Sequence, residues 1–481
     1  MTFNRHAPEQ NGLSMRTETD TLGAVQVPDD AYYGAQTARA IENFPISGVA
    51  IGRYQKFIAA LAQIKMAAAR ANFRLGDLAE PKARAIQLAC NDLLDGKAGD
   101  QFPVDIFQGG AGTSTNMNMN EVVANLALEH MGRARGDYDA LHPNNDVNQS
   151  QSTNDVYPTA IRMTLLVHTV ELTAALDELA RSFETKGTEF EDILKLGRTQ
   201  LQDAVPMTLG QEFTAFGVTV REDIDRLGET AALLREVNLG GTAIGTGITT
   251  DPRYQSLVLD ELNALTGLSL VPARNLVEAG WDVGAFVSYS GQLKRLAVKL
   301  SKIASDLRLL SSGPRGGLGE IRLPEMQPGS SIMPGKVNPV IPEVVNQVAF
   351  HVIGADLTVT LAAESGQLQL NAFEPVILGS LLNALTLLTN VVRVFAARCV
   401  IGIEVDRDRS VHHLEESTAL VTALIPFIGY QRAATLAKAK LETGESIASL
   451  LAKEGLLSKT LLATALDARA ITTPLRVRAN D

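Results

Sequence analysis

Apolar residues in the middle of the chain recur at alternating steps of three and four positions. The clearest series comprises Leu293, Leu296, Leu300, Ile303, Leu307 and Leu310. The residues that follow it, Ser311 to Pro314, are a strong helix stop signal. A second series comprises Leu381, Leu385, Leu388, Val392, Phe395 and Cys399. A third, which opens just after Pro158, comprises Ile161, Leu165, Leu172, Leu176, Leu179 and Phe183. Such seams are buried in left-handed bundles, so the pattern predicts at least three long, packed helices.

The rest of the pattern separates this bundle from the two ends of the chain. Short β-branched runs do not alternate with the helices, which disfavours a parallel α/β sheet. Both ends have shorter segments, more Gly and Pro, and no long apolar seam. We therefore expect an all-α fold with an N-terminal domain (1–153), a long central helical bundle (154–408) and a small C-terminal domain (409–481). Apolar faces left over on the bundle favour burial against other subunits.

Composition and charge narrow the class of protein. Of the 481 residues, 45% are hydrophobic and 20% are charged, which is typical of a soluble globular chain. Lys and Arg number 43 against 54 Asp and Glu, and the net charge of -11 argues against nucleic acid as a partner. A site for an anionic substrate must therefore be locally positive.

The sequence disfavours several kinds of site, and it disfavours a secreted or membrane location. The two cysteines, Cys90 and Cys399, are far apart, so neither a disulfide framework nor a Cys metal site is expected. The adjacent pair His412 and His413 lacks metal-pair spacing, and the glycines from Gly240 to Gly247 lack the dinucleotide pattern. We expect no metal and no cofactor. Because no signal peptide and no apolar run of ~18 residues occurs, we expect a cytoplasmic protein without a membrane partner.

The segment Gly329–Pro339 is the most informative stretch for chemistry. It holds two glycines, two prolines, two hydroxyls, one amide and one cation, Lys336. Glycine lets backbone N–H groups approach an anion, and the lysine adds positive charge. A nucleotide-binding P-loop requires four residues between its glycines and Ser or Thr after the lysine, whereas here five intervene and Val337 follows. Composition alone leaves open an anion-binding loop or a plain surface turn.

Three more segments gather hydroxyls and amides. They are Gly109–Asn116, the stretch from His142 to Asp155, and Gly197–Pro206. Ser, Thr and Asn beside free N–H groups at a helix start suit a bound carboxylate. Ordinary helix capping is the alternative for the first two.

In their order along the chain, these segments resemble the motifs of the aspartase/fumarase superfamily, which also includes argininosuccinate and adenylosuccinate lyases. The resemblance extends from Pro28–Gly34 and Arg39–Phe44 to Gly402–Glu404. It implies three domains per chain and a homotetramer whose central helices form a twenty-helix bundle. Each active site is then shared by three subunits.

The resemblance also implies the chemistry. The reaction removes a proton from a carbon beside a carboxylate, forms an aci-carboxylate and expels the neighbouring group. Ser330 is implied as the base, acting as an alkoxide beside Lys336. The carboxylate next to the abstracted proton is implied to bind Thr113, Ser152, Thr153 and Ser331. The other carboxylate is implied to bind Thr199, Lys336 and Asn338, with Arg39. The leaving group is implied to lie near Asn154, Thr113 and Gln200.

Gln200 bears on the branch of the superfamily. Loss of hydroxide from malate benefits from an acid, whereas an ammonium group already carries its proton, and glutamine cannot act as an acid. The forms of Thr113–Ser114, Asn144–Asp146 and Val340–Glu343 resemble the aspartase branch, although Gly34–Thr37 is closer to fumarase and Leu276–Asp282 matches neither. We expect elimination of ammonia from L-aspartate to give fumarate. Fumarase, a lyase for a substituted aspartate or another amino acid, and a structural lens-type protein remain as alternatives.

Overall fold

The computed structural model describes residues 14–455 and 467–474, and it divides the chain into two compact units. The first unit comprises Met1–Glu171, Leu227–Leu293 and Gly354–Thr386, and the second comprises the remaining segments. Five long helices contribute residues to both units: α5 (Thr153–Glu189), α6 (Leu209–Ala232), α8 (Gly284–Leu310), α9 (Val340–Glu364) and α10 (Glu374–Arg398). The division into three domains remains a prediction.

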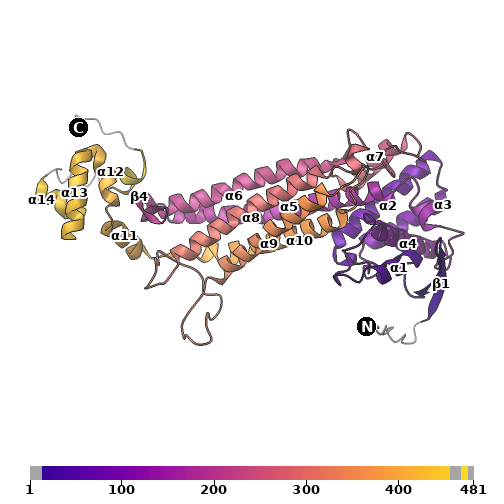
Figure 1. Cartoon of the computed structure of the whole chain (residues 1–481), viewed down its shortest axis with the longest axis horizontal. Helices are drawn as coiled ribbons and strands as arrows, with labels where there is room; N and C mark the ends of the chain where they lie inside the picture. Colours follow the sequence, from indigo (N-terminus) through magenta and orange to yellow (C-terminus); the bar gives the residue numbers. More distant parts are fainter. Residues whose placement is uncertain (1–13, 456–466, 475–481) are drawn as a thin grey trace. The chain divides into compact units, whose positions relative to one another are not determined.

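The first unit also contains shorter helices and two small sheets. The helices are α1 (Ala35–Asn43), α2 (Gln55–Leu75), α3 (Glu80–Leu94), α4 (Thr113–His130) and α7 (Tyr254–Thr266). The strands β1 (Met15–Asp20) and β2 (Gly23–Pro28) pair antiparallel, and β5 (Glu236–Val237) pairs parallel with β6 (Val271–Pro272). Helix α2 packs against α3 and α7, and α3 packs against α4 (Figure 1).

The second unit contains a hairpin, a short ladder and a group of small helices. The hairpin is β3 (Leu194–Thr199) with β4 (Gln202–Thr208), and β7 (Ile321–Arg322) pairs antiparallel with β8 (Glu404–Val405). The small helices are α11 (Arg407–Glu416), α12 (Ala419–Ile428), α13 (Tyr430–Thr443), α14 (Ile447–Glu454) and α16 (Ala468–Thr472). In this unit the long helices lie side by side (Figure 1). Their contacts include a cluster of aromatic rings, namely Phe183, Phe213, Phe216 and Phe395.

The three apolar seams form buried helix faces, as predicted. Every residue of the three series is at most 5% exposed, and the series lie on α5, α8 and α10, with Cys399 directly after α10. Helix α8 ends at Leu310, immediately before the predicted stop signal. Strands of the described residues form only two-stranded ladders. The all-α prediction is confirmed.

Helix α2 is longer than expected for the N-terminal end of the chain, where the sequence showed shorter segments and no long apolar seam. It has 21 residues and buries Phe57, Leu61 and Ile64 on one face. Alanines occupy much of the helix, and alanine favours helix without marking which face is buried. The buried and exposed positions of α2 therefore differ too little in hydrophobicity for the sequence pattern to show an apolar seam.

Helix α5 begins five residues before Pro158, so the proline lies inside the helix. Proline has no N–H group and cannot donate to the carbonyl four residues earlier, which here belongs to Asn154. The Asn238 side-chain amide donates to that carbonyl instead, at 2.9 Å. This replacement lets the helix continue through the proline.

Helices α9 and α10 differ in how much of their apolar surface is covered. By length and composition alone, Val340–Glu364 and Glu374–Gly402 could each cross a membrane. The apolar window of the second is 61% buried, against 33% for the first. On α9, Phe350, Leu357 and Leu361 are 58–63% exposed. Because they are spaced by seven and four positions, these three side chains lie on one face of the helix.

Candidate functional site

The residues implied as a site fall into two groups, one in each unit. The first unit holds Arg39, Thr113, Ser152, Thr153 and Asn154. The second unit holds Thr199, Gln200, Ser330, Ser331, Lys336 and Asn338. Most of these residues lie at the ends of helices and strands or in the loop before α9, and a joint site made from both groups remains a prediction.

Thr113 opens helix α4 and is exposed. The residue before it, Gly112, has φ +92°, and a Cβ atom there would lie 2.4 Å from the buried ring of Tyr157. Glycine is therefore required for the turn that presents Thr113. The Thr113 hydroxyl donates to the Gly110 carbonyl at 2.7 Å, so its oxygen is left to accept a hydrogen bond from a ligand.

Ser152 and Asp155 form a capping box at the start of α5. The Ser152 N–H donates to Asp155 Oδ1 at 2.9 Å, and the Asn154 N–H donates to Ser152 Oγ at 3.2 Å. The capping interpretation of this motif is thus correct for Ser152. Thr153 and Asn154, between them, make other contacts. Thr153 Oγ1 accepts a hydrogen bond from Asn116, and the Asn154 amide donates to the Ala243 carbonyl at 2.8 Å.

A buried lysine, Lys65, supports this group and was missed by the sequence analysis. Its Nζ donates to three side-chain amide oxygens, which belong to Asn116, Asn148 and Gln151, at 2.8–3.0 Å. Because the Asn116 oxygen faces the ammonium, its NH₂ group must face Thr153, whose own proton is then free to point outward. Burial lowers the pKa of Lys65 to about 7. A single lysine on the apolar face of α2 was the available signal.

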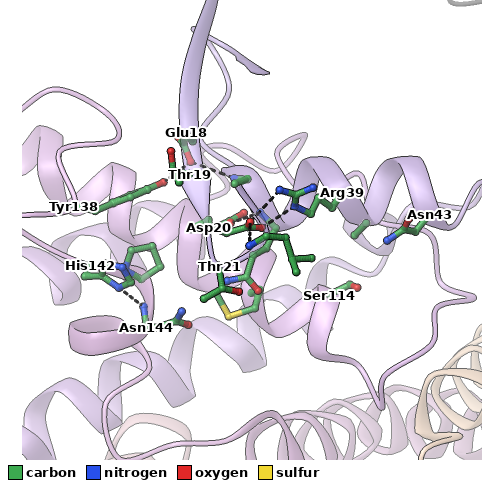
Figure 2. Close-up of a pocket in the computed structure, with 17 residues that line it drawn as sticks. Glu18, Thr19, Asp20, Thr21, Arg39, Asn43, Ser114, Tyr138, His142 and Asn144 are labelled. Atoms are coloured by element: carbon green, nitrogen blue, oxygen red, sulfur yellow. Dashed lines mark hydrogen bonds and ion pairs between the residues drawn. The ribbon is translucent and has the colours of Figure 1, made fainter. Parts of the chain in front are cut away.

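Arg39 lies in a cavity of about 640 Å³ between the β1–β2 turn, α1 and the 142–144 segment. Figure 2 shows its guanidinium paired with Asp20, at 2.8 and 2.9 Å. These hydrogen bonds lower the pKa of Asp20. In the same cavity, His142 Nδ1 accepts hydrogen bonds from the Asn144 and Asn145 N–H groups. Arg39 therefore already has a carboxylate partner, and His142 caps the short helix Pro143–Val147.

The segment Leu323–Pro339 contains no helix or strand, as its composition predicted. Two contacts close it into a ring: the Gly329 N–H donates to the Lys336 carbonyl and the Asn338 amide donates to the Gly329 carbonyl, both at 2.7 Å. Inside the ring, Ser330 Oγ accepts hydrogen bonds from the Ile332 and Met333 N–H groups, at 3.1 and 3.0 Å. Two donors on one hydroxyl oxygen stabilise negative charge there.

Thr199 and Gln200 lie at the exposed turn of the β3–β4 hairpin. Gln200 and Leu201 both have positive φ, +54° and +61°. Two-residue hairpin turns of this type favour Asn and Gly, so Gln-Leu breaks a local rule. Strain of this kind concentrates at functional sites. Arg198, the residue before Thr199, anchors the hairpin through an ion pair with the fully buried Glu320 at 2.7 Å.

Among the residues that the structure describes, no group of three or more His, Cys, Asp and Glu side chains could hold a metal ion. The described elements instead present hydroxyls, amides, backbone N–H groups and a few cations. Such a set binds carboxylates and stabilises a transient negative charge by hydrogen bonding.

Comparisons with known proteins agree with this chemistry. Residues 23–354 match a family described as Lyase, and residues 420–473 match one described as Fumarase C C-terminus. The chain is 58% identical to the aspartate ammonia-lyase of Pseudomonas aeruginosa, over 94% of this chain and 95% of that protein.

Two crystal structures are also similar to the chain. The first, fumarate lyase:delta crystallin from Brucella melitensis bound to cobalt, superposes with a TM-score of 0.93 and 58% identity, over 96% of this chain and 100% of that one. The second, a class II fumarase from Schistosoma mansoni, has a TM-score of 0.88 and 34% identity, over 95% and 98%.

Proposed function

The chain belongs to the lyase family that includes the aspartate ammonia-lyases, and from this membership we propose that it reversibly eliminates ammonia from L-aspartate to give fumarate. The observation that carries the chemistry is Ser330 Oγ, which accepts two backbone N–H donors inside a closed loop. Those donors favour the alkoxide form that a serine needs to act as a base.

In the proposed reaction, Ser330 Oγ takes a proton from the carbon beside one carboxylate of aspartate. The electron pair of the C–H bond moves into that carboxylate, which becomes an aci-carboxylate. Ser152, Thr153 and Ser331 donate hydrogen bonds to its oxygens, and Thr113 joins them when its hydroxyl proton turns away from the Gly110 carbonyl. Collapse of this intermediate forms the double bond of fumarate and breaks the C–N bond, and the nitrogen leaves as ammonia with its own protons.

The other end of the substrate meets a separate set of groups in this proposal. Thr199, Lys336 and Asn338 hold the second carboxylate, with Arg39 contributing only if it parts from Asp20. The ammonium lies against neutral acceptors, Asn154 and Gln200. Neither side chain can protonate a departing hydroxide, so the set favours aspartate over malate. The identities of 58% with an aspartate ammonia-lyase and 34% with a class II fumarase support the same choice.

We further propose a homotetramer in which three subunits contribute to each site. The two residue groups belong to different units of the chain, and the exposed apolar stripe of α9 offers a surface for another subunit. The cytoplasmic location and the absence of nucleic-acid and membrane partners remain predictions from the sequence.

Turnover can be followed by the ultraviolet absorbance of fumarate. We expect absorbance to rise with L-aspartate and not with L-malate in a parallel cuvette. Turnover of malate alone would identify a fumarase. Inertness to both would favour a substituted aspartate or a structural role.

A further inference from the structure

The Asn154 side chain is held by a segment distant in sequence, Asn238–Ala243 (the 238–243 segment). The Asn154 Nδ2 group donates to the Ala243 carbonyl at 2.8 Å, and the Asn238 amide donates to the Asn154 carbonyl at 2.9 Å. A carbonyl oxygen accepts and cannot donate, so the NH₂ end of the Asn154 amide must face Ala243. Its oxygen therefore faces the other way, and no donor among the described residues meets it.

The position of the Ala243 carbonyl depends on an unusual backbone at Thr242. This residue has φ +54°, a left-handed conformation that a β-branched side chain rarely adopts. Thr242 is also buried. A conformation of this kind persists only where neighbouring contacts impose it.

Asp155 imposes that conformation from the start of α5. Its Oδ2 accepts hydrogen bonds from the Gly240 and Thr242 N–H groups, each at 3.0 Å, while its Oδ1 accepts from Ser152. The Asp155 side chain is fully buried, and these three N–H groups are hydrogen-bonded to it. One carboxylate thus fastens the 238–243 segment to the helix turn that carries Asn154.

We propose that the 238–243 segment, fastened by Asp155, is a positioning element that turns the Asn154 oxygen toward the substrate ammonium. An ammonium group presents N–H donors and requires acceptors. The hydroxyl of malate requires an acid when it departs, and a side-chain amide cannot supply a proton. This inference rests on the proposed function, in which Asn154 lies beside the leaving group.

The test displaces the segment without changing Asn154, Asp155 or Ser152. Gly240 has φ +92°, and a Cβ atom there would lie 2.9 Å from Gln255 Cβ. Gly240→Ala should therefore shift the backbone that ends at Ala243. The measurements are the KM for L-aspartate and the Ki for succinate, which has both carboxylates but no amino group.

We expect Gly240→Ala to raise the KM for L-aspartate by about 10-fold, the lower range for losing a hydrogen bond to a charged group. The Ki for succinate should stay within about 2-fold, because succinate does not use the Asn154 oxygen. Asn154→Ala should give the same selective loss. The matched control is Gly267→Ala, a left-handed glycine at φ +68° with no atom within 4 Å of an added Cβ, and it should leave the ratio of the two constants unchanged.

Equal losses for aspartate and succinate in Gly240→Ala would indicate general damage and overturn the proposal, as would no change in either constant. If Gly240→Ala does not fold by circular dichroism, Asn154→Ala decides alone, because an unselective effect there contradicts the role of the oxygen. Wild-type turnover of L-aspartate is measured first. Its absence would contradict the proposed function and this inference together, whereas unselective variants of an active enzyme contradict only the inference.

Discussion

Apart from Lys336 and Arg39, the side chains proposed for chemistry are neutral hydroxyls and amides. The groups hydrogen-bonded to them set their behaviour. Ser330 Oγ receives two backbone N–H donors, and Thr153 Oγ1 receives the Asn116 amide, which in turn meets the buried Lys65 ammonium. Thr153, Asn116 and Lys65 are buried, and hydrogen bonds in such a low-dielectric setting are stronger than in water. Neutral residues can therefore hold a dicarboxylate without a row of exposed cations.

Replacement of the proposed base is the most direct test at this scale. Ser330→Ala should lower kcat by at least ~10²-fold, because a positioned base contributes at least that much. Steady-state kinetics with L-aspartate measure the effect, and Ser365→Ala, directly after α9 and distant in sequence from the loop, serves as control. Near-normal turnover in Ser330→Ala would remove Ser330 from the role.

Glu374 offers a test of stability against pH. Burial raises its pKa to about 8, and Arg162 offsets this only in part. Because the folded chain holds this proton more tightly than the unfolded chain, the resulting stabilisation is present below pH 4.5 and is lost as pH rises through about 8. The glutamine in Glu374→Gln does not ionise. The melting temperature of this variant should therefore rise relative to that of the wild type as the pH increases from 4.5 to about 8. If the melting temperatures of the two proteins change with pH in parallel, the raised pKa of Glu374 is contradicted.

At the scale of elements, the candidate residues lie where helices and strands begin or turn. Thr113 opens α4, Ser152 caps α5, and Gln200 occupies the β3–β4 turn. Such positions leave backbone groups without partners in the element, and those groups are available to a ligand. The long helices therefore form a rigid scaffold, and the residues proposed for chemistry lie at its ends and turns.

The start of α4 gives a prediction about packing. Gly112→Ala should lower the melting temperature strongly, because the added Cβ would lie 2.4 Å from the buried Tyr157 ring and the backbone is left-handed. Gly132→Ala, which follows the same helix, is the matched control. It shares the positive φ but has open space around the Cβ, so only the conformational cost of about 1 kcal/mol remains. Equal destabilisation by both would mean that the Tyr157 contact contributes nothing.

At the scale of the whole molecule, the apolar stripe of α9 is the surface proposed for another subunit. Phe350, Leu357 and Leu361 are more than half exposed on the isolated chain. In a tetramer with shared sites, covering this stripe and completing the sites are the same event. Assembly and activity should therefore fail together.

Sedimentation velocity tests this coupling. The wild type should sediment as a particle of about four times the 51.5 kDa chain mass, in the range common for homo-oligomers. Leu357→Glu places a charge on the stripe and should dissociate the assembly and abolish turnover of L-aspartate. Leu441→Glu, at a leucine of α13 that is even more exposed, should do neither. An active monomer would contradict shared sites.

Much of the fold was decided by the sequence alone. The three apolar seams, the end of α8 at Leu310 and the irregular loop around Ser330 follow from local periodicity and turn chemistry, which act within a few residues. The family and its reaction followed from ordered motifs. Helix α2 was missed because alanine gives little contrast between faces.

Only the tertiary structure decided which groups support the site. Lys65 meets Asn116, and Asp155 meets Thr242, across 51 and 87 residues of sequence. No local pattern encodes such pairs, because each contact depends on how separate elements pack. The tertiary structure likewise shows that Arg39 is not a free cation, because it forms an ion pair with Asp20. The sequence by itself determined the kinds of residue at the site, and packing determined their orientation and charge.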